Sequence, residues 1–227
     1  MICFVDDLRL EMRAERHAAL GDAIRLAIVD QLLLSDRAPV ELRQLLEVES
    51  NLLAHHLDVL ESVGMISRFQ SSGDGRRRYV HLIRGSLVDL GLGRRMEPAR
   101  ALFVCTKNSA RSQLAAAMWR SVTGAPADSA GTHPADALHV GAVDAARRVG
   151  LDLSGATPHP LDQIAELPDL VVTVCDQAHE ELAPNANWLH WSIADPVPDG
   201  TRAAFDSTVN QLRERITGLV GDSGIAS

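Results

Sequence analysis

The sequence is poor in lysine, cysteine and aromatic residues. It has one lysine, and its 22 basic residues face 30 acidic ones, which gives a formal net charge of −8. Such a chain does not coat nucleic acid through bulk positive charge, so any contact with DNA must be local. Cysteine occurs three times, widely spaced and without Cys-x-x-Cys, so neither a disulfide scaffold nor a zinc ribbon is indicated. With aromatics at 4%, Ala, Leu and Val must fill the core.

Long apolar runs are also lacking. No run reaches membrane-spanning length, and the start, MICFVDDLRLEMRAER, is too charged for a secretory signal. We therefore expect a cytoplasmic protein with no membrane partner, whose cysteines are reduced and able to react.

The hydrophobic pattern changes near the middle of the chain. It is helical up to about residue 90, and after about residue 99 strand-like runs alternate with helical ones. GLGRRMEP, at 91–98, is a plausible linker because it holds glycines and a proline. We therefore expect two domains, at residues 1–92 and 99–227.

The first half has the outline of a winged helix-turn-helix. Apolar residues at helical spacing run on from His17, a short helix starts at Pro39, and a second helix begins near Ser50 and ends at Gly64. Ser50 is a good N-cap candidate. MISRFQ, the turn SSGDG and RRRYVHLI then predict a β-hairpin. The second helix would enter the major groove, and arginines beside the hairpin tip would contact phosphates or the minor groove.

This half resembles the arsenical-resistance repressor (ArsR) family, through AHHLDVLESVGMI and GDGRRRYVHL. The resemblance implies a homodimer on a palindromic double-stranded operator. The candidate DNA-binding residues are Ser50, Asn51, His55, Arg76, Arg77 and Arg78. One departure is that VELRQLLEV lacks the paired cysteines with which arsenite-sensing members bind their ligand. His55 and the adjacent His56 diverge on a helix, so we expect a solvated histidine beside a core one and no metal site.

The second half predicts a doubly wound α/β domain with a four-stranded parallel sheet, because strand and helix patterns alternate. The predicted strands are RALFVC (100–105), DSAGT (128–132), DLVVTVC (169–175) and NWLHWSI (187–193). Sites in such sheets form outside the carboxyl ends of the strands. Cys105, Cys175 and Asp195 each follow or end such a strand, so we expect them at one edge.

The segment from Cys105 to Arg111 predicts an anion trap with a nucleophile at its base. A loop between strand and helix can point backbone N–H groups inward, and here it would use Thr106, Lys107, Asn108, Ser109 and Ala110. Arg111 supplies a planar fork for two oxygens of an oxyanion, and these charges favour the thiolate of Cys105. Ser112 could hydrogen-bond that thiolate, whereas Lys107 is expected to be solvated.

Cys-x5-Arg-Ser after a strand resembles the low-molecular-weight phosphotyrosine phosphatase fold, which includes thiol-linked arsenate reductases. SAGTHP, VGLDLSG, DLVVTVCD and HWSIADPV follow in that fold's order, over residues 99–220. The resemblance implies that Cys105 attacks the oxyanion, that Asp195 is the general acid and that Asn108 shapes the loop. Cys175 stands where the reductases keep their first resolving thiol, although an inert buried thiol is the alternative.

Three features favour a reductase over a phosphatase. The loop CTKNSARSQ is closer to the reductases' loop, a second cysteine is present, and Asp195-Pro196 is followed by Val197 rather than by aromatic residues. No further cysteine follows Cys175, so the reductant must be an external thiol: mycothiol, glutathione with glutaredoxin, or thioredoxin. No bound cofactor is expected.

Together these features predict an arsenic-responsive regulator fused to an arsenate reductase that converts arsenate to arsenite. One alternative is a non-catalytic second half that senses arsenite or another phosphate-like oxyanion and controls DNA binding. The other is a low-molecular-weight protein tyrosine phosphatase.

Overall fold

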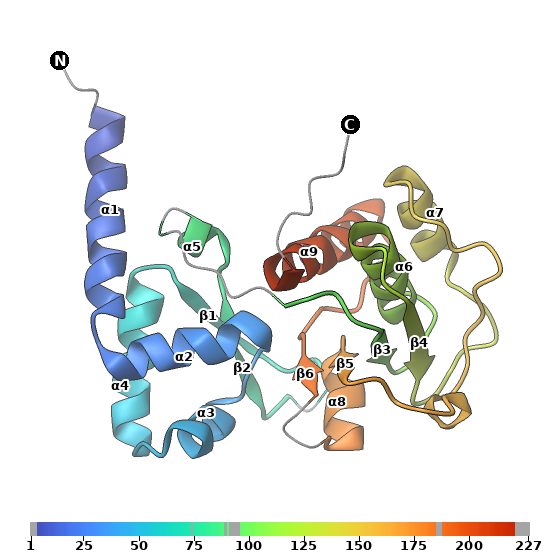
Figure 1. Cartoon of the computed structure of the whole chain (residues 1–227), viewed down its shortest axis with the longest axis horizontal. Coiled ribbons are helices and arrows are strands. Elements are labelled where there is room, and N and C mark those ends of the chain that lie inside the picture. The colour runs from blue at the N-terminus through green and yellow to red at the C-terminus, as the bar shows by residue number, and fades with distance from the viewer. Residues whose placement is uncertain (1–3, 74, 89, 91–95, 185–187, 221–227) are drawn as a thin grey trace. The chain divides into compact units, whose positions relative to one another are not determined.

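The computed structural model describes residues 4–73, 75–88, 90, 96–184 and 188–220. The chain divides into two compact units, residues 1–70 with 77–94, and residues 71–76 with 95–227 (Figure 1). Most of the predicted linker, at 91–95, lies outside the described residues, as does Cys3. No helix in the described part of the chain is both long and apolar enough to cross a bilayer.

The first unit consists of helices and one antiparallel hairpin. Its elements are α1 (Phe4–Leu20), α2 (Ala23–Leu34), α3 (Pro39–Leu46), α4 (Ser50–Ser62), β1 (Ile66–Gln70), β2 (Arg78–Leu82) and α5 (Gly85–Val88). The predicted stripe of Leu53, Leu57 and Leu60 on α4 is buried in the core of this unit. The helices, the turn between α3 and α4, and the hairpin follow in the predicted order.

Two helix boundaries in this unit differ from the sequence prediction. The helical pattern from His17 is broken at residues 21–22, where the Asp22 carboxylate accepts hydrogen bonds from the first N–H groups of α2. Ser50 is not an N-cap, because the cap position of α4 falls on Glu49 and Ser50 is already helical. Gly64 ends α4 with a φ of 66°, a conformation that glycine adopts without strain. His56 is buried and His55 is exposed, as predicted.

The second unit has a four-stranded parallel sheet of order β4-β3-β5-β6, which confirms the predicted α/β class. Its elements are β3 (Ala101–Cys105), α6 (Arg111–Thr123), β4 (Ala127–Gly131), α7 (Val140–Arg148), η1 (Leu161–Gln163), β5 (Leu170–Thr173), α8 (Asp176–Leu182), β6 (Leu189–His190) and α9 (Arg202–Val220). The predicted strands at 169–175 and 187–193 were too long, and α8 was not predicted. Residues 174–175 and 191–193 instead belong to the loops that follow β5 and β6.

Strand β3 is buried on both faces, as its continuous apolar run indicates. Phe103 points towards α6, where its ring lies 6.0 Å from that of Trp119. Leu102 and Val104 point to the opposite face and pack with Leu182 of α8. The sheet therefore lies between α6 and α9 on one face and α8 on the other (Figure 1).

The functional edge of the sheet follows from the strand order. From β3 the chain crosses to β4 on one side and then returns to β5 on the other, so the order reverses between β3 and β5. Crevices at such a reversal, outside the carboxyl ends of the strands, are the usual ligand sites of open parallel sheets. Cys105 ends β3, and Cys175 follows the end of β5 by two residues.

Candidate functional site

The loop between β3 and α6 encloses the Cys105 thiol. Cys105 is 2% exposed. Its Sγ accepts a hydrogen bond from the backbone N–H of Asn108 at 3.2 Å and lies 3.0 Å from Oγ of Ser112. Both groups can donate to a thiolate, and Ser112 is brought to the predicted position.

The carbonyl groups of this loop are turned away from its interior. Residues of the segment 132–139 donate backbone hydrogen bonds to the carbonyls of Cys105, Thr106, Lys107 and Ser109, at 2.8–3.1 Å. Loop N–H groups are thereby left to face inward, and the start of α6 has no side-chain cap that would compete for its first N–H groups. The loop and the helix start therefore form one cradle for an anion.

Asn108 fixes the shape of the loop. Its backbone is left-handed, with a φ of 49°, which asparagine tolerates better than most residues. Its amide nitrogen donates to Ser112 and Ser129, and its amide oxygen accepts from Gln113 and from the backbone of His159. Every hydrogen-bonding group of this buried side chain thus has a partner, so the conformation is held from several elements.

The neighbouring strand approaches the loop at Gly131. A Cβ atom there would lie 2.8 Å from the carbonyl oxygen of Thr106 and 3.0 Å from Cβ of Asn108. Contacts this short with backbone cannot be relieved by a side-chain rotation, so the close approach requires glycine.

Arg111 is buried at the mouth of the cradle and is already paired. Its Nη1 donates to the carbonyl of Ile193 at 2.9 Å, and its Nη2 lies 3.0 Å from Oδ2 of Asp195. Asp195 is partly exposed and also accepts from the N–H of Val197. The predicted general acid therefore lies beside the predicted oxyanion ligand and occupies one of its guanidinium nitrogens.

Cys175 lies close to the same loop. Its Sγ is 3.3 Å from Oγ1 of Thr106 and accepts from the N–H of Ala178, which caps α8. Burial raises the pKa of the Cys175 thiol, and the nearby Arg111 opposes this shift. Burial therefore disfavours the thiolate of Cys175, whose sulfur contacts the Thr106 hydroxyl of the loop that holds Cys105.

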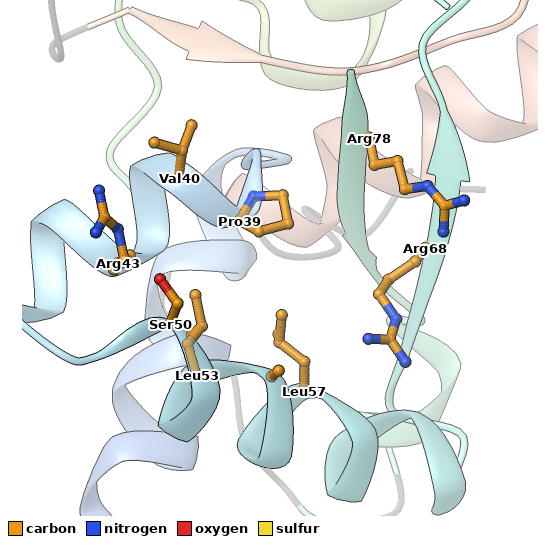
Figure 2. Close-up of a pocket in the computed structure, with 9 residues that line it drawn as sticks. Pro39, Val40, Arg43, Ser50, Leu53, Leu57, Arg68 and Arg78 are labelled. Atoms are coloured by element: carbon orange, nitrogen blue, oxygen red, sulfur yellow. The ribbon is translucent and has the colours of Figure 1, made fainter. Parts of the chain in front are cut away.

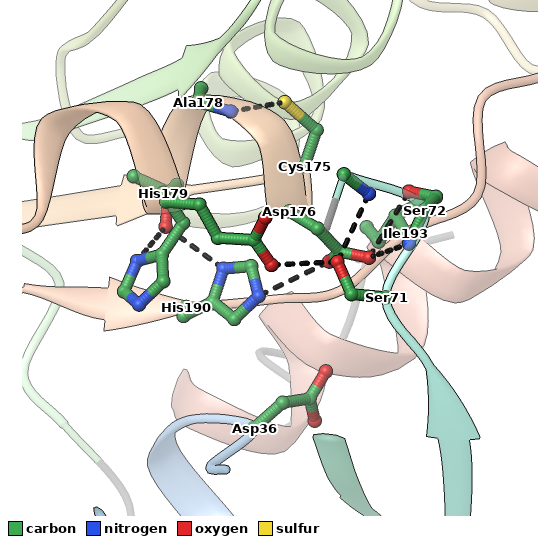
Figure 3. Close-up of polar contacts among 12 residues, drawn as sticks. Asp36, Ser71, Ser72, Cys175, Asp176, Ala178, His179, His190 and Ile193 are labelled. Carbon is green, nitrogen blue, oxygen red and sulfur yellow. Dashed lines mark hydrogen bonds and ion pairs between the residues drawn. The ribbon is translucent and has the colours of Figure 1, made fainter. Parts of the chain in front are cut away.

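A buried polar network fixes α8 behind Cys175. Figure 3 shows His190 between His179 and Asp176, and Nε2 of His190 lies 3.3 Å from the carboxylate of Asp176. Oγ1 of Thr173 lies 3.0 Å from Nδ1 of both histidines. Burial alone would raise the pKa of Asp176, but hydrogen bonds, that of His190 foremost, bring it below its usual value. This carboxylate stays charged and ties α8 to β6.

The remaining predicted residues are those proposed to contact DNA. Ser50, Asn51 and His55 are exposed on α4. Arg76, Arg77 and Arg78, just before and at the start of the second hairpin strand, are exposed too. Arg76 belongs to the segment grouped with the second unit. A groove of about 540 Å³ between α3, α4 and the hairpin is lined by Arg43, Arg68 and Arg78 around an apolar floor (Figure 2). Arg68 is paired with Asp58 and Glu61.

Sequence reasoning missed several contributors to this site. Gln113 gave a signal, because it belongs to the same motif as Arg111 and Ser112. Ser129, Thr173 and His190 gave none, since each reaches the site from a separate strand. Lys107 is exposed, as predicted. Among the described residues, no group of three or more His, Cys, Asp or Glu side chains could hold a metal ion.

The family model for low molecular weight phosphotyrosine protein phosphatase matches residues 100–225. The chain belongs to this family. Its match begins at the second unit, so the first ninety-nine residues lie outside it. The matched residues include the whole loop from Cys105 to Arg111.

Relatives that match this part of the chain include arsenate reductases. Arsenate reductase 2 of Staphylococcus haemolyticus is 34% identical over 106 residues, which cover 44% of this chain and 81% of the relative. An arsenate reductase of Oceanobacillus iheyensis is 33% identical over 121 residues, 50% of this chain and 86% of the relative. A solved structure described as an arsenate reductase in the phosphate binding state is 27% identical, with a TM-score of 0.44, and covers 52% of this chain and 93% of that one.

Proposed function

We propose that the second unit reduces arsenate to arsenite, with Cys105 as the nucleophile. The observation that carries the proposal is the buried Cys105 at the base of an anion cradle, together with a second thiol, Cys175, which contacts the hydroxyl of Thr106 in the same loop. The similarity to arsenate reductases over most of their length supports the choice of oxyanion.

In the first step the Cys105 thiolate attacks the arsenic atom of arsenate. The loop N–H groups and Arg111 hold the other oxygens. Because these donors are already in place, they stabilise the negative charge that develops on those oxygens in the transition state. One arsenic–oxygen bond breaks, and that oxygen leaves as water with a proton that Asp195, beside Arg111, first takes from the bound arsenate. A sulfur–arsenic bond replaces it.

In the second step a thiol attacks Sγ of Cys105 and forms a disulfide, and its proton passes to an oxygen of the departing arsenic group. The electron pair of the broken sulfur–arsenic bond stays on arsenic, which becomes arsenite while two thiols are oxidised. The contact between Thr106 and Cys175 supports Cys175 as the attacking thiol. An external thiol then reduces the disulfide, and mycothiol, glutathione with glutaredoxin, and thioredoxin are the candidates.

Steady-state arsenite release tests this proposal. Purified full-length protein is supplied with arsenate and, in parallel, each of the three donor systems, and arsenite is separated from arsenate chromatographically. We expect release with at least one donor and none from the Cys105→Ser variant. Equal release from that variant would refute the role of Cys105.

Phosphatase activity is the second candidate, because the family's name refers to it and the same cradle suits a phosphate ester. The stretch from Val197 to Gly200 contains no aromatic ring that could stack on a phosphotyrosine. We expect hydrolysis of an aryl phosphate to be slow beside arsenate reduction. The reverse order would favour the phosphatase.

We also propose that the first unit is a winged helix-turn-helix of the ArsR type that binds double-stranded operator DNA as a homodimer, in the cytoplasm. The helix–turn–helix–hairpin order supports this, and so do the exposed Asn51 and His55 on α4 and the basic groove beside them.

Selection from a random duplex library would identify a DNA site that the protein binds. Arg77→Ala should weaken binding and reduce its salt dependence, while Arg13→Ala on exposed α1 should not. Equal binding by both variants would contradict this surface.

A further inference from the structure

Helix α7 begins with an unusual cap. Nδ1 of His139 accepts a hydrogen bond from the N–H of Gly141 at 3.1 Å, in place of the short polar side chains that usually cap helices. An imidazole that accepts at Nδ1 carries its proton at Nε2, so the cap uses the neutral ring.

The backbone of the same residue contacts the oxyanion loop. The N–H of His139 donates to the carbonyl of Ser109 at 2.9 Å, while its carbonyl accepts from the N–H groups of Ala142 and Val143. His139 therefore joins the first turn of α7 to the second half of the loop.

The ring of His139 is held in place by α9. It stacks on Phe205, with ring centroids 5.1 Å apart and planes 18° from parallel. Phe205 is buried, and a Cβ atom at Gly141 would overlap its ring, so the helix start and the aromatic ring fit closely. This packing restricts His139 to the capping position.

We propose that His139 is a positioning residue for oxyanion binding. Its cap fixes the first turn of α7, which holds the Ser109 carbonyl outward and so aims the N–H groups of the loop's second half at the anion. The role rests on the proposed oxyanion site and needs no reduction step. The contacts to the Cys105 thiol come from Asn108 and Ser112, so they do not depend on His139.

The test measures how inorganic phosphate protects Cys105 of the full chain from iodoacetamide, with the alkylated site identified by mass spectrometry. His139→Ala removes the cap, whereas His139→Asn restores it with a side chain that caps helices well. Val140→Ala is the control, because Val140 is the neighbouring residue and is 70% exposed. We expect His139→Ala to need about 3- to 10-fold more phosphate for half protection, a factor set by the loss of one helix cap.

The asparagine and control variants should match the wild type within about twofold, with the alkylation rate without phosphate unchanged in all of them. Wild-type protection in His139→Ala would overturn the proposal. So would an asparagine variant as weak as the alanine variant, since stacking rather than capping would then matter. A phosphate-free rate altered in His139→Ala would show general damage to the loop and also overturn it. No protection of the wild type by phosphate would remove the oxyanion site itself.

Discussion

Replacing Asp195 by asparagine should separate oxyanion binding from chemistry. The carboxylate lies 3.0 Å from Nη2 of Arg111, so an incoming oxyanion meets a guanidinium that already has an anionic partner. Asparagine removes the negative charge and the carboxyl group that can take up and transfer a proton, but it keeps an oxygen for the N–H of Val197. Loss of the charge should strengthen oxyanion binding, whereas loss of proton transfer should slow the reaction, so the variant separates binding from chemistry.

The size of each effect follows from the geometry. Asp195 is 39% exposed, so solvent screens the pair and its removal is worth at most about 1 kcal/mol. Phosphate and arsenate should therefore bind up to about fivefold more tightly. Loss of the general acid should slow adduct formation by about 10²- to 10⁴-fold.

Two assays measure the two quantities. Phosphate protection of Cys105 from alkylation gives affinity, and arsenate consumption in a single turnover gives the rate. Asp199→Asn is the control, since Asp199 is exposed nearby. A rate within about threefold of wild type, or weaker phosphate binding, would refute the roles given to Asp195.

Three further predictions concern the surroundings of the loop. Gly131→Ala should weaken phosphate binding by about tenfold or more and lower the melting temperature, because its Cβ would strike the Thr106 carbonyl; unchanged binding would contradict this. Alkylation of Cys175 should be slow at neutral pH and should speed up only above the pH at which ordinary thiols ionise, because burial raises its pKa. Rapid alkylation at neutral pH would contradict this. The pKa of Asp176 is depressed below 3.8, so it contributes stability that is lost as pH falls through that lower value. Asp176→Asn should make the free energy of unfolding depend less on pH in that acidic range. An unchanged pH dependence would count against the charged pair of Asp176 and His190.

The sequence was informative where chemistry depends on neighbours along the chain. Cys105, Asn108, Arg111 and Ser112 lie within eight residues, so a strand end, a loop and a helix start placed them together before any packing was known. The parallel sheet was predictable for a similar reason, because β3 is a continuous apolar run with no solvated face.

Features that depend on packing between distant segments were not predictable. The segment 132–139 turns the loop carbonyls outward through backbone hydrogen bonds, which leave no mark on side-chain pattern. His190 was assigned to a strand, yet its pairing with Asp176 required the position of α8, which was missed. The N-cap at Ser50 was wrong because capping preference is a local tendency that the geometry of the preceding turn can override.

The central claim is that this chain supplies the two electrons that convert arsenate to arsenite, through Cys105 and Cys175. A single turnover without any external thiol tests it: reduced, full-length protein is mixed with arsenate, arsenite is quantified and disulfides are mapped by mass spectrometry. The account predicts close to one arsenite per chain, a Cys105–Cys175 disulfide, and neither product from Cys175→Ser. Free thiols and no arsenite from folded wild-type protein would contradict it.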